Sequence, residues 1–477
     1  MDDRLMTSDR RTFLGTGLGI AAAVTSHTYG LTAAAQADAA EMPSRDSARS
    51  EASGDFGRLI HREPRAVAQP VSSAEVASLL RLARSEGLKV AARGQGHSIY
   101  GRSLSEDGIV IDMGRLGSIR ELRPDRIVVE AGATWKSVLD ATLAQGLTPP
   151  VLTNYLGLSV GGTLAVGGIG GASSRHGMQT DNVLEFDVVT GDGQELTCSA
   201  TSNPNAFDAV RAGLGQCGII TRATLRLQRA PERVRRFQLF YLGLTELMAD
   251  QRRVLAEERF DQLQGAILPD SAGGWRYQLD AAVYYNEDRL PDDAALLKIL
   301  SDTRSAAVIT DLTYGEDAAA FAKFEALLRS KGQWATPKPW LLTFLHARNA
   351  EQIARDVLAG LTDADVGPFG RITCYPMLTR ACRTPLFRLP DESIVFPFNV
   401  IRMPASNDAA AAQRMVAQNR VLYDRIRSAG GLQYPVGAFP MSHGDWKDHF
   451  GSSWPRFSES KQRLDPANLL TPGYGIF

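Results

Sequence analysis

The stretch "ARGQGHSIYG", residues 92–101, decides the fold, because it sets a histidine between glycines with a serine directly behind it. A buried histidine needs no glycines beside it, and a metal-binding histidine usually has a second ligand nearby. Glycines lack side chains, so they let a large anionic group lie against bare backbone. We therefore expect this stretch to form a loop around such a group, with His97 as the residue that holds it.

A second glycine-rich stretch, "LSVGGTLAVGGIGGASSRHG" at residues 158–177, has seven glycines among twenty residues. In a regular element each glycine costs about 0.5–1 kcal/mol relative to alanine, so this density needs a reason. Apolar residues alternate with the glycines, which favours a buried turn over a flexible loop. The backbone N–H groups of two such loops, about sixty residues apart, suit a diphosphate better than a single phosphate.

The stretch "GLGQCG", residues 213–218, matches the dinucleotide fingerprint G-x-G-x-x-G but stands in the opposite context. That fingerprint needs a strand before it and a helix after it. In this chain a helix-like run, 206–212, precedes the glycines and a strand-like run, 219–227, follows them. The pattern therefore argues against a nicotinamide-binding Rossmann site.

The chain has 477 residues, 44% of them hydrophobic, which is enough for two or three domains with cores of their own. Its formal net charge is -1, so bulk charge recruits neither nucleic acid nor an anionic membrane. The sequence has no C-x-x-C pair and no H-E-x-x-H motif, and we expect no metal site. Of the four cysteines, Cys374 and Cys382 could pair in a hairpin, but small buried hydrophobic residues are the favoured interpretation.

The first 37 residues have the pattern of a twin-arginine export signal. Arg10 and Arg11 precede a short apolar run rich in alanine and glycine, and "AQA" at residues 35–37 fits a cleavage site of small residues. The apolar run is too short to span a bilayer stably, so no membrane span is expected. A retained N-terminal tail is the alternative. The signal predicts a periplasmic or secreted protein, and this export route carries proteins that have already folded.

Residues 38–55 are polar and alanine-rich, and we interpret them as a linker. A helix and a strand follow in "PVSSAEVASLLRLARSEGLKVAARG", residues 70–94, with Ser72 or Ser73 as the helix cap. Short strands beside segregated helices favour an α+β fold over a regular βαβ series. From about residue 235 the pattern changes to alternating strands and long helices, which predicts a second α+β unit.

Five motifs recur in a fixed order that resembles a known family. They are "ARGQGHSIYG", "TNYLGLSVGGTLAVGGIGG", "SRHGMQTDNVLEFDVVTGDG", "NAFDAVRAGLGQCGIITRATL" and "DHFGSSWPRFSESKQRLDPANLLTPGYGIF". As an ordered set they resemble the cytokinin dehydrogenases, within the vanillyl-alcohol-oxidase-type (PCMH) FAD-linked oxidoreductases. The resemblance implies a PCMH-type FAD-binding domain over residues 56–232 and an α+β substrate domain with an antiparallel sheet over 233–433. It also implies that a C-terminal segment, 434–477, returns to close the FAD domain.

The resemblance further implies the cofactor and its contacts. FAD would be bonded covalently to His97, and a histidine without any bond to the flavin is the plainer alternative. The second loop has no cysteine, which argues against a doubly attached flavin. By position, the residues expected to contact FAD are Ala92, Arg93, Gly94, Gln95, Gly96, His97, Ser98, Arg102, Asn154, Ser159, Gly162, Ala165, Ile169, Ile219, Tyr434, Thr471 and Tyr474.

Two carboxylates of the family are amides in this chain. The family motif T-D-Y-L, whose aspartate is expected to take a proton from the substrate amine, has Asn154 at the aspartate position. The ligand-binding glutamate of the family pattern F-D-Y-V-E-G aligns with Gln264 in "FDQLQG". An amide takes no proton near neutral pH, and loss of a general base typically costs about 10²–10⁴-fold in rate. We therefore expect Asn154 and Gln264 in the catalytic centre, without the proton chemistry that cytokinin oxidation uses in the family.

The leading prediction is an exported FAD-dependent oxidoreductase that takes a hydride from a C–H bond beside nitrogen or oxygen in a small organic substrate. Its electrons would pass to dioxygen, a quinone or another acceptor. A sugar or alcohol oxidase on the same flavin domain is the first alternative, and a flavin-bearing binding or sensor protein without turnover is the second. If another residue serves as the base, the sequence offers His443, Tyr375 and Asp445 as candidates.

Overall fold

The computed structural model describes residues 46–477, apart from residues 271, 272 and 406. The chain separates into two units, residues 1–39 and 40–477, and every described residue belongs to the second. The predicted export signal, 1–37, and the first part of the predicted linker, 38–45, lie outside the described residues.

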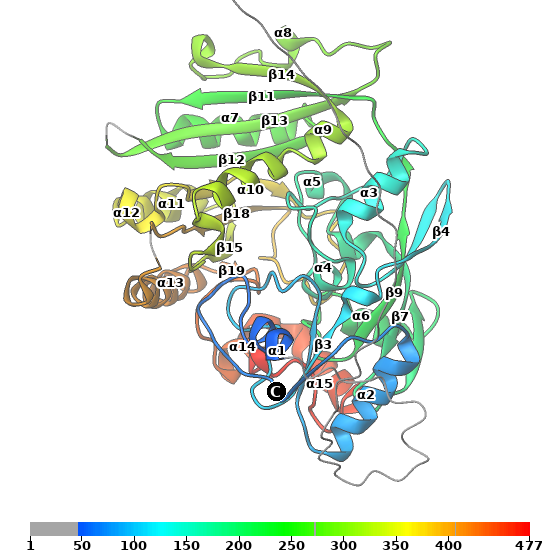
Figure 1. The fold of residues 1–477 in the computed structure, drawn as a ribbon. Coiled ribbons are helices and arrows are strands. Elements are labelled where there is room, and N and C mark those ends of the chain that lie inside the picture. The colour runs from blue at the N-terminus through cyan, green and yellow to red at the C-terminus, as the bar shows by residue number, and fades with distance from the viewer. Residues whose placement is uncertain (1–45, 271–272, 406) are drawn as a thin grey trace, which may run out of the picture. The chain divides into compact units, whose positions relative to one another are not determined.

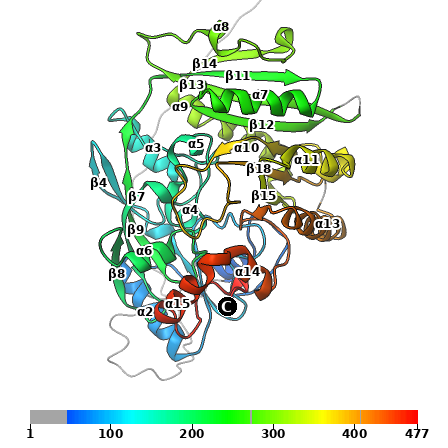
Figure 2. The same cartoon turned by 180° about the vertical axis from the view of Figure 1, so that it is seen from behind.

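Four sheets and the helices around them make up the described part of the chain (Figure 1). The largest sheet occupies the top and the left of Figure 1, with α7 (Leu244–Ala256) across its upper strands, and the smaller sheets lie to its right and below. Figure 2 shows the same arrangement from behind. The longer helices are α2 (Ser73–Ser85), α3 (Trp135–Leu143), α7 (Leu244–Ala256), α10 (Phe321–Ser330), α11 (Ala350–Ala359), α13 (Ala409–Ser428), α14 (His443–Phe450) and α15 (Trp454–Leu464). The shorter helices are α1 (Asp46–Ala52), α4 (Val160–Val166), α5 (Ser173–His176), α6 (Pro204–Val210), α8 (Asp293–Leu296), α9 (Tyr314–Ala318) and α12 (Asp363–Val366).

A three-stranded parallel sheet carries the His97 loop at the end of its strand β2. Helix α2 packs on this sheet, and its apolar residues share one core with those of the strands. The predicted cap of α2 is confirmed, because the Ser72 hydroxyl accepts a hydrogen bond from the Glu75 N–H at 3.2 Å, which typically contributes about 1 kcal/mol. In spatial order the strands are β1 (Ala66–Ala68), β3 (Ile109–Asp112) and β2 (Val90–Arg93).

A five-stranded antiparallel sheet forms the rest of the N-terminal half. Helix α6 leads into the glycines of 213–218 and strand β9 follows them, so the predicted order of helix, glycine turn and strand is confirmed. In spatial order the strands are β4 (Ile119–Arg123), β5 (Arg126–Glu130), β9 (Ile219–Arg226), β7 (Val183–Val189) and β8 (Glu195–Ser199). A separate pair joins β6 (Leu147–Thr148) to β10 (Gln228–Arg229).

The large sheet has nine strands, and all its pairs are antiparallel, which confirms the predicted antiparallel sheet of the substrate domain. Along the sheet the strands are β14 (Val308–Thr313), β11 (Arg233–Tyr241), β13 (Trp275–Tyr285), β12 (Gln262–Pro269), β16 (Arg371–Cys374), β18 (Ile394–Ile401), β15 (Leu341–His346) and β19 (Leu432–Gln433), with β17 (Met377–Leu378) beside β18.

The two faces of the large sheet differ in polarity around β12. Leu263 of β12 and Leu279 of β13 share a core with Leu247 of α7, so this face is apolar. Successive side chains of a strand point to opposite faces, which places Gln262 and Gln264 on the other face. The amide side chains of Gln262 and Gln264 therefore lie on the face of the sheet that is opposite to α7.

The C-terminal segment returns to the His97 sheet and is held there by a buried ion pair. The Lys461 ammonium contacts Asp465 Oδ2 at 2.6 Å, and both residues are almost fully buried. The Asp465 carboxylate also accepts the backbone N–H groups of Leu469 and Leu470, at 3.0 and 2.9 Å. Leu470 then pairs in parallel with Val90, at the start of β2. The end of the chain is thereby joined to the strand that precedes the His97 loop.

The glycines at 213–218 bind this returning segment. The Thr471 hydroxyl donates to the carbonyl of Gly215 at 2.9 Å, and the Gln216 amide donates to the carbonyl of Thr471 at 3.0 Å. A Cβ on Gly215 would lie 2.7 Å from the Thr471 hydroxyl oxygen, and the φ of Gly215 is +70°, so glycine is needed for both reasons. The motif that resembles a dinucleotide fingerprint is therefore a contact within the protein.

The predicted linker is wrong from residue 46 onward. Residues 46–52 form α1, and Ser53 and Asp55 are buried. The Asp55 carboxylate is hydrogen-bonded to the His97 loop, and the Arg93 guanidinium donates to the carbonyl of Gly54 at 2.8 Å. The polar residues that suggested a linker instead make hydrogen bonds to the loop that carries His97.

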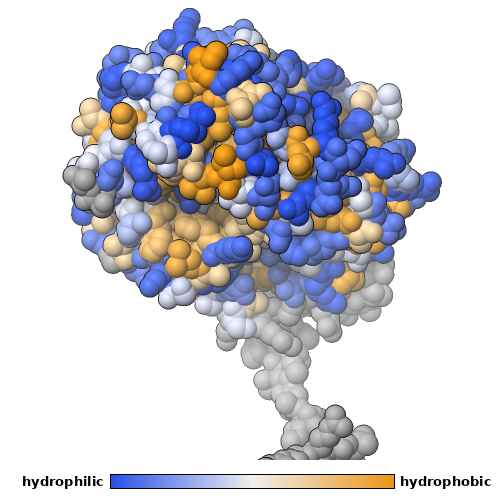
Figure 3. Space-filling model, turned by 90° about the horizontal axis from the view of Figure 1, so that it is seen from above, coloured by the Kyte–Doolittle hydropathy of each residue, from blue (hydrophilic) through white to orange (hydrophobic). Residues whose placement is uncertain are grey.

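The four cysteines are free, and Cys198, Cys217 and Cys374 are buried, in agreement with the favoured interpretation. Seen from above, the surface over the large sheet is mainly hydrophilic with separate hydrophobic patches (Figure 3). Exposed hydrophobic side chains include Leu242 and Ile299. Within the described residues, none of the helices has both the length and the apolar character that a bilayer crossing requires.

Candidate functional site

The imidazole of His97 lies among aromatic rings from three distant segments of the chain. The ring of Phe56 stacks on it, with 3.9 Å between ring centroids and 16° between the planes. Tyr155 lies at 4.8 Å, beside the second glycine-rich stretch, and Trp334 at 5.8 Å comes from the large-sheet half of the chain. Aromatic pairs at such distances contribute about 0.5–1.5 kcal/mol each, so His97 has a defined orientation.

The environment keeps His97 neutral. Burial lowers the pKa of His97 to about 3, and the positive charges of Lys338 and Arg329 act in the same direction. Neither ring nitrogen has a hydrogen-bond partner within the described part of the chain. A neutral imidazole has one nitrogen with a free lone pair, so His97 is chemically able to form a bond to carbon.

The two glycine-rich loops predicted to hold a diphosphate lie against each other. A Cβ on Gly94 would lie 2.0 Å from the hydroxyl oxygen of Ser159, so any side chain at position 94 would separate the loops. Ser159 is buried directly before α4, and Gly162 follows on the same helix, where a Cβ would lie 2.9 Å from the same hydroxyl. Gly96 has φ +62° and faces the Arg93 side chain. The structure therefore brings together Gly94, Gly96, Ser159 and Gly162.

Arg102 offers a buried positive charge that no carboxylate neutralises within the described residues. Its guanidinium donates from Nη1 to the carbonyl of Gly473 at 3.2 Å and lies over the Tyr474 ring at 4.6 Å. Its Nε is buried without a partner, and burial lowers the pKa of the guanidinium. A buried cation with an unused donor fits an anionic ligand, so these residues fit the diphosphate of FAD.

The other predicted FAD contacts are spread around these loops. Ala165 and Ile169 follow Gly162, and Ile219 is buried at the start of β9. Thr471 and Tyr474 lie in the returning C-terminal segment, and the Tyr474 hydroxyl donates to the carbonyl of Pro435 beside Tyr434 at 3.2 Å. Gln95 is exposed, whereas Ala92 lies within strand β2. The side chains of Arg93 and Ser98 bind the segment 54–55, so their contact with FAD stays a prediction.

The two catalytic predictions lie in different surroundings. The Asn154 side chain is exposed next to Tyr155, and it has no hydrogen-bond partner within the described chain. Gln264 lies on the amide face of the large sheet and is hydrogen-bonded to the Tyr375 hydroxyl. Its neighbour on that face, Gln262, would lie 2.9 Å from a Cβ on Gly171, so this face meets the glycine-rich stretch. Asn154 is therefore next in sequence to Tyr155, whose ring contacts His97, whereas Gln264 contacts Tyr375.

The three alternative base candidates differ in where they lie. His443 caps the end of the chain, with its Nδ1 at 2.7 Å from the carbonyl oxygen of Ile476. Asp445 forms ion pairs with Arg420 and Arg427, both at 2.8 Å. Its bonds to Arg420 and Ser442 lower its pKa. Tyr375 alone contacts a predicted catalytic residue, and burial raises its pKa to about 12. At neutral pH the Tyr375 hydroxyl is therefore protonated and is no base.

Sequence reasoning missed Phe56, Trp334 and Lys338. Phe56 lies in a stretch of polar composition, and Trp334 and Lys338 lie in "GQWATPKPW", residues 332–340, which matches no motif of known chemistry. An aromatic residue within an otherwise polar N-terminal stretch was the available signal for Phe56. The sequence contains no comparable signal for Lys338, because an isolated lysine is usually exposed.

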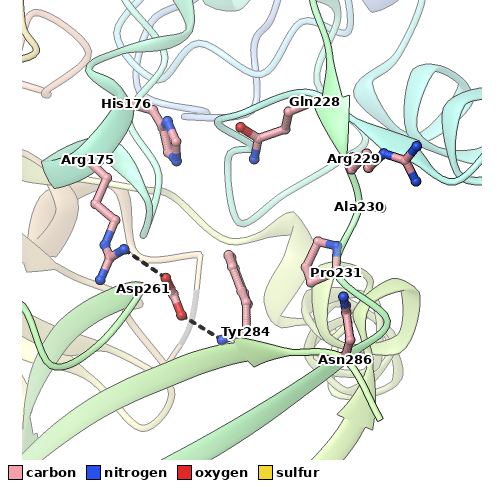
Figure 4. Close-up of a pocket in the computed structure, with 9 residues that line it drawn as sticks. All are labelled: Arg175, His176, Gln228, Arg229, Ala230, Pro231, Asp261, Tyr284 and Asn286. Atoms are coloured by element: carbon pink, nitrogen blue, oxygen red, sulfur yellow. Dashed lines mark hydrogen bonds and ion pairs between the residues drawn. The ribbon is translucent and has the colours of Figure 1, made fainter. Parts of the chain in front are cut away.

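A cavity in the described structure is lined by residues other than His97 (Figure 4). It has a volume of about 330 Å³, and His176 and Gln228 point into it from opposite sides. Arg175 pairs with Asp261 at 3.0 Å on its wall, and the Asp261 carboxylate accepts the Tyr284 N–H at 2.7 Å. His97, Asn154 and Gln264 do not line this cavity.

Two family models match the chain in succession. The model described as "FAD binding domain" matches residues 64–199, which include both glycine-rich loops. The model described as "Cytokinin dehydrogenase 1, FAD and cytokinin binding" matches residues 266–477.

Two relatives match over most of the chain. An uncharacterized oxidoreductase of the fasciation locus of Rhodococcoides fascians is 44% identical over 423 residues, which cover 89% of this chain and 96% of the relative. Cytokinin dehydrogenase 10 of Oryza sativa subsp. japonica is 34% identical over 485 residues, which cover 90% of this chain and 87% of the relative.

Solved structures share the fold. The 6-hydroxy-D-nicotine oxidase of Arthrobacter nicotinovorans superposes with a TM-score of 0.73 at 20% identity, over 91% of this chain and 97% of that one. A chitooligosaccharide oxidase superposes with a TM-score of 0.71 at 17% identity, over 92% of this chain and 97% of that one. Together with the full-length relatives, these matches agree with the loops and the antiparallel sheet, and the chain belongs to the FAD-binding PCMH-type oxidoreductases that include the cytokinin dehydrogenases.

Proposed function

We propose that this FAD-dependent oxidoreductase bonds its flavin to His97 and takes a hydride from a C–H bond beside nitrogen or oxygen in a small, neutral organic substrate. The observation that carries the proposal is the position of His97 just after strand β2, beside the second glycine-rich stretch, with ring nitrogens that have no hydrogen-bond partner within the described residues. Bound FAD supplies the hydride acceptor. Dioxygen or a quinone then takes up the electrons.

The amides at 154 and 264 support a substrate other than cytokinin. Asn154 can donate a hydrogen bond to a substrate nitrogen or oxygen and can accept one from its N–H or O–H group, but it removes no proton near neutral pH. Gln264 is already hydrogen-bonded to Tyr375, and the raised pKa of Tyr375 keeps its hydroxyl protonated. These groups orient a substrate and exclude water, so a substrate with a neutral amine or hydroxyl at the reacting carbon fits them best.

A panel of reductants under nitrogen tests this function directly. We expect at least one neutral amine or alcohol to bleach the visible absorbance of the yellow protein, because hydride transfer reduces the flavin. Dithionite provides the control, since it reduces any accessible flavin. Complete bleaching by dithionite without bleaching by any amine, alcohol or sugar would contradict the proposed turnover and favour a flavin-bearing sensor.

Replacing His97 by alanine tests the bond to the flavin. We expect acid precipitation of the wild-type protein to leave the colour in the pellet, whereas His97→Ala releases its flavin to the supernatant, because no nucleophilic nitrogen remains. Absorbance of the two fractions measures the outcome. His176→Ala, in the separate cavity, is the matched control and keeps the colour in the pellet. Release of all flavin from the wild-type protein would contradict the covalent bond.

Restoring a carboxylate at position 154 tests the substrate argument. We expect Asn154→Asp to raise kcat/KM on isoprenoid adenines by about 10²-fold, because a positioned base contributes that much or more. Steady-state rates of the pure variant check this result. Asn205→Asp makes the same change at the surface, where Asn205 contacts Arg456, and leaves the rates unchanged. No gain with Asn154→Asp would show that position 154 is not the site of proton transfer.

We propose further that the protein is exported by the twin-arginine route, on the strength of Arg10 and Arg11. We expect a double lysine replacement of these residues to keep the full-length precursor in the cytoplasm, because the pathway recognises arginine specifically and lysine keeps only the charge. Cell fractionation and the mass of the mature N-terminus measure this. A wild-type protein that is not cleaved near Ala37 would contradict the proposal.

A further inference from the structure

The segment Asp55-Phe56-Gly57, which we call the Asp55 clip, binds the loop that carries His97. Only 6% of the Asp55 surface is exposed. Its Oδ2 accepts hydrogen bonds from the Gly101 N–H at 2.7 Å and from the Ser98 hydroxyl at 3.0 Å, and its Oδ1 accepts the Gly57 N–H at 3.1 Å. Hydrogen bonds to an ionised carboxylate are about twice as strong as neutral ones. Asp55 therefore fixes the loop on the C-terminal side of His97.

The backbone of the clip fixes the loop on both sides of His97. The Phe56 N–H donates to the carbonyl of Gly96 at 2.9 Å, and the Gly57 N–H donates to the carbonyl of Ser98 at 3.1 Å. Gly96 and Ser98 are the two neighbours of His97. A Cβ on Gly57 would lie 2.0 Å from the carbonyl oxygen of Ile99, so the close approach requires glycine at this position.

The side chain of Phe56 fixes the imidazole plane. The two rings are nearly parallel, at 16°, with their centroids 3.9 Å apart. Phe56 also contacts Trp334 and Trp340, with centroids at 4.8 and 5.8 Å. One face of the His97 ring is therefore covered by a residue that is itself held by two tryptophans.

Lys338 ties the clip to the other half of the chain. Its N–H donates to the carbonyl of Gly57 at 2.9 Å, and its side chain is fully buried. The ammonium donates to the carbonyl of Gln333 at 3.0 Å and lies 5.0 Å from the centroid of the Phe56 ring. No carboxylate in the described ranges pairs with it, and burial lowers the pKa of Lys338 to about 7. Near neutral pH the charged fraction of Lys338 acts on the ring cluster around His97.

From these contacts we infer that the Asp55 clip is a positioning element for flavin attachment: it holds the His97 imidazole in the one orientation from which its free nitrogen reaches the flavin. The inference rests on the covalent bond proposed above. Asp55 and Phe56 act through His97 and are positioning residues.

The attachment reaction makes strict demands on that orientation. A ring nitrogen of His97 forms a bond to a methyl carbon of the flavin, and one C–H bond of that methyl group breaks. The electron pair of the broken bond and two protons, one from the methyl group and one from the imidazole N–H, reduce the flavin, and dioxygen then accepts them as hydrogen peroxide. A misplacement of about 1 Å between reacting atoms can slow such a step by about 10²-fold.

Two clip variants of the full-length protein test the inference. Asp55→Asn leaves one acceptor oxygen for three donors, and Phe56→Leu keeps an apolar side chain but removes the stacking. For both variants we expect total flavin per polypeptide close to the wild-type value, while the acid-stable fraction falls about tenfold or more. The mass of the tryptic peptide 94–102, which contains His97, measures attachment directly. Thermal unfolding is recorded alongside.

Asp250→Asn is the matched control. Asp250 is equally buried, at 1% exposure, and its carboxylate accepts the Ser301 N–H at 2.6 Å in the large-sheet half of the chain. We expect it to keep the wild-type acid-stable fraction, whatever its effect on the melting temperature.

The outcomes separate the two proposals. Wild-type attachment in both clip variants would overturn the positioning role alone. Parallel loss of total and acid-stable flavin would also overturn it, because the clip would then serve only the fold. A wild-type protein whose peptide 94–102 has no added mass would refute the covalent bond itself, before any variant is compared.

Discussion

The buried ion pair between Lys461 and Asp465 is the interaction on which the flavin half of the molecule depends. Asp465 orients the backbone of Leu469 and Leu470, and Leu470 then pairs with Val90. Removal of one partner from such a buried pair typically costs about 3–5 kcal/mol, because the remaining charge stays buried without compensation. Strand β2, and the His97 loop beyond it, are therefore stabilised by a segment almost four hundred residues later in the chain.

The ring cluster around His97 likewise depends on residues that lie far apart in the sequence. Its members come from positions 56, 97, 155 and 334, so no local stretch of sequence builds it. Burial by these rings removes water from the imidazole, and that desolvation is the main cause of its low pKa. The low pKa of His97 therefore depends on the assembled fold and not on the residues beside it in the sequence. The amides at 154 and 264 differ, because their inability to take a proton belongs to the side chains themselves.

The parts that could be predicted from sequence are those with a local physical cause. Glycine density marked two stretches that pack closely together, although residues 160–166 of the second form helix α4 and not a loop. The serine before α2 predicted its cap, and the order of elements around residues 213–218 argued against a Rossmann site. The clip could not be predicted, because Asp55 acts on residues more than forty positions away and a polar stretch has the same composition whether it is solvated or buried. Lys338 is a similar case, since its hydrogen bonds go to backbone carbonyls that leave no trace in composition.

The closing of the cofactor loops by Thr471, Gly473 and Tyr474 has a consequence for biogenesis. Translation proceeds from the N-terminus, so residues 92–102 leave the ribosome long before their partners are made. A shorter nascent chain lacks the partners of Arg102 and Gly215 that residues 471–474 supply. The loop of residues 92–102 therefore gains these contacts only after synthesis has reached Tyr474, so its final packing forms late.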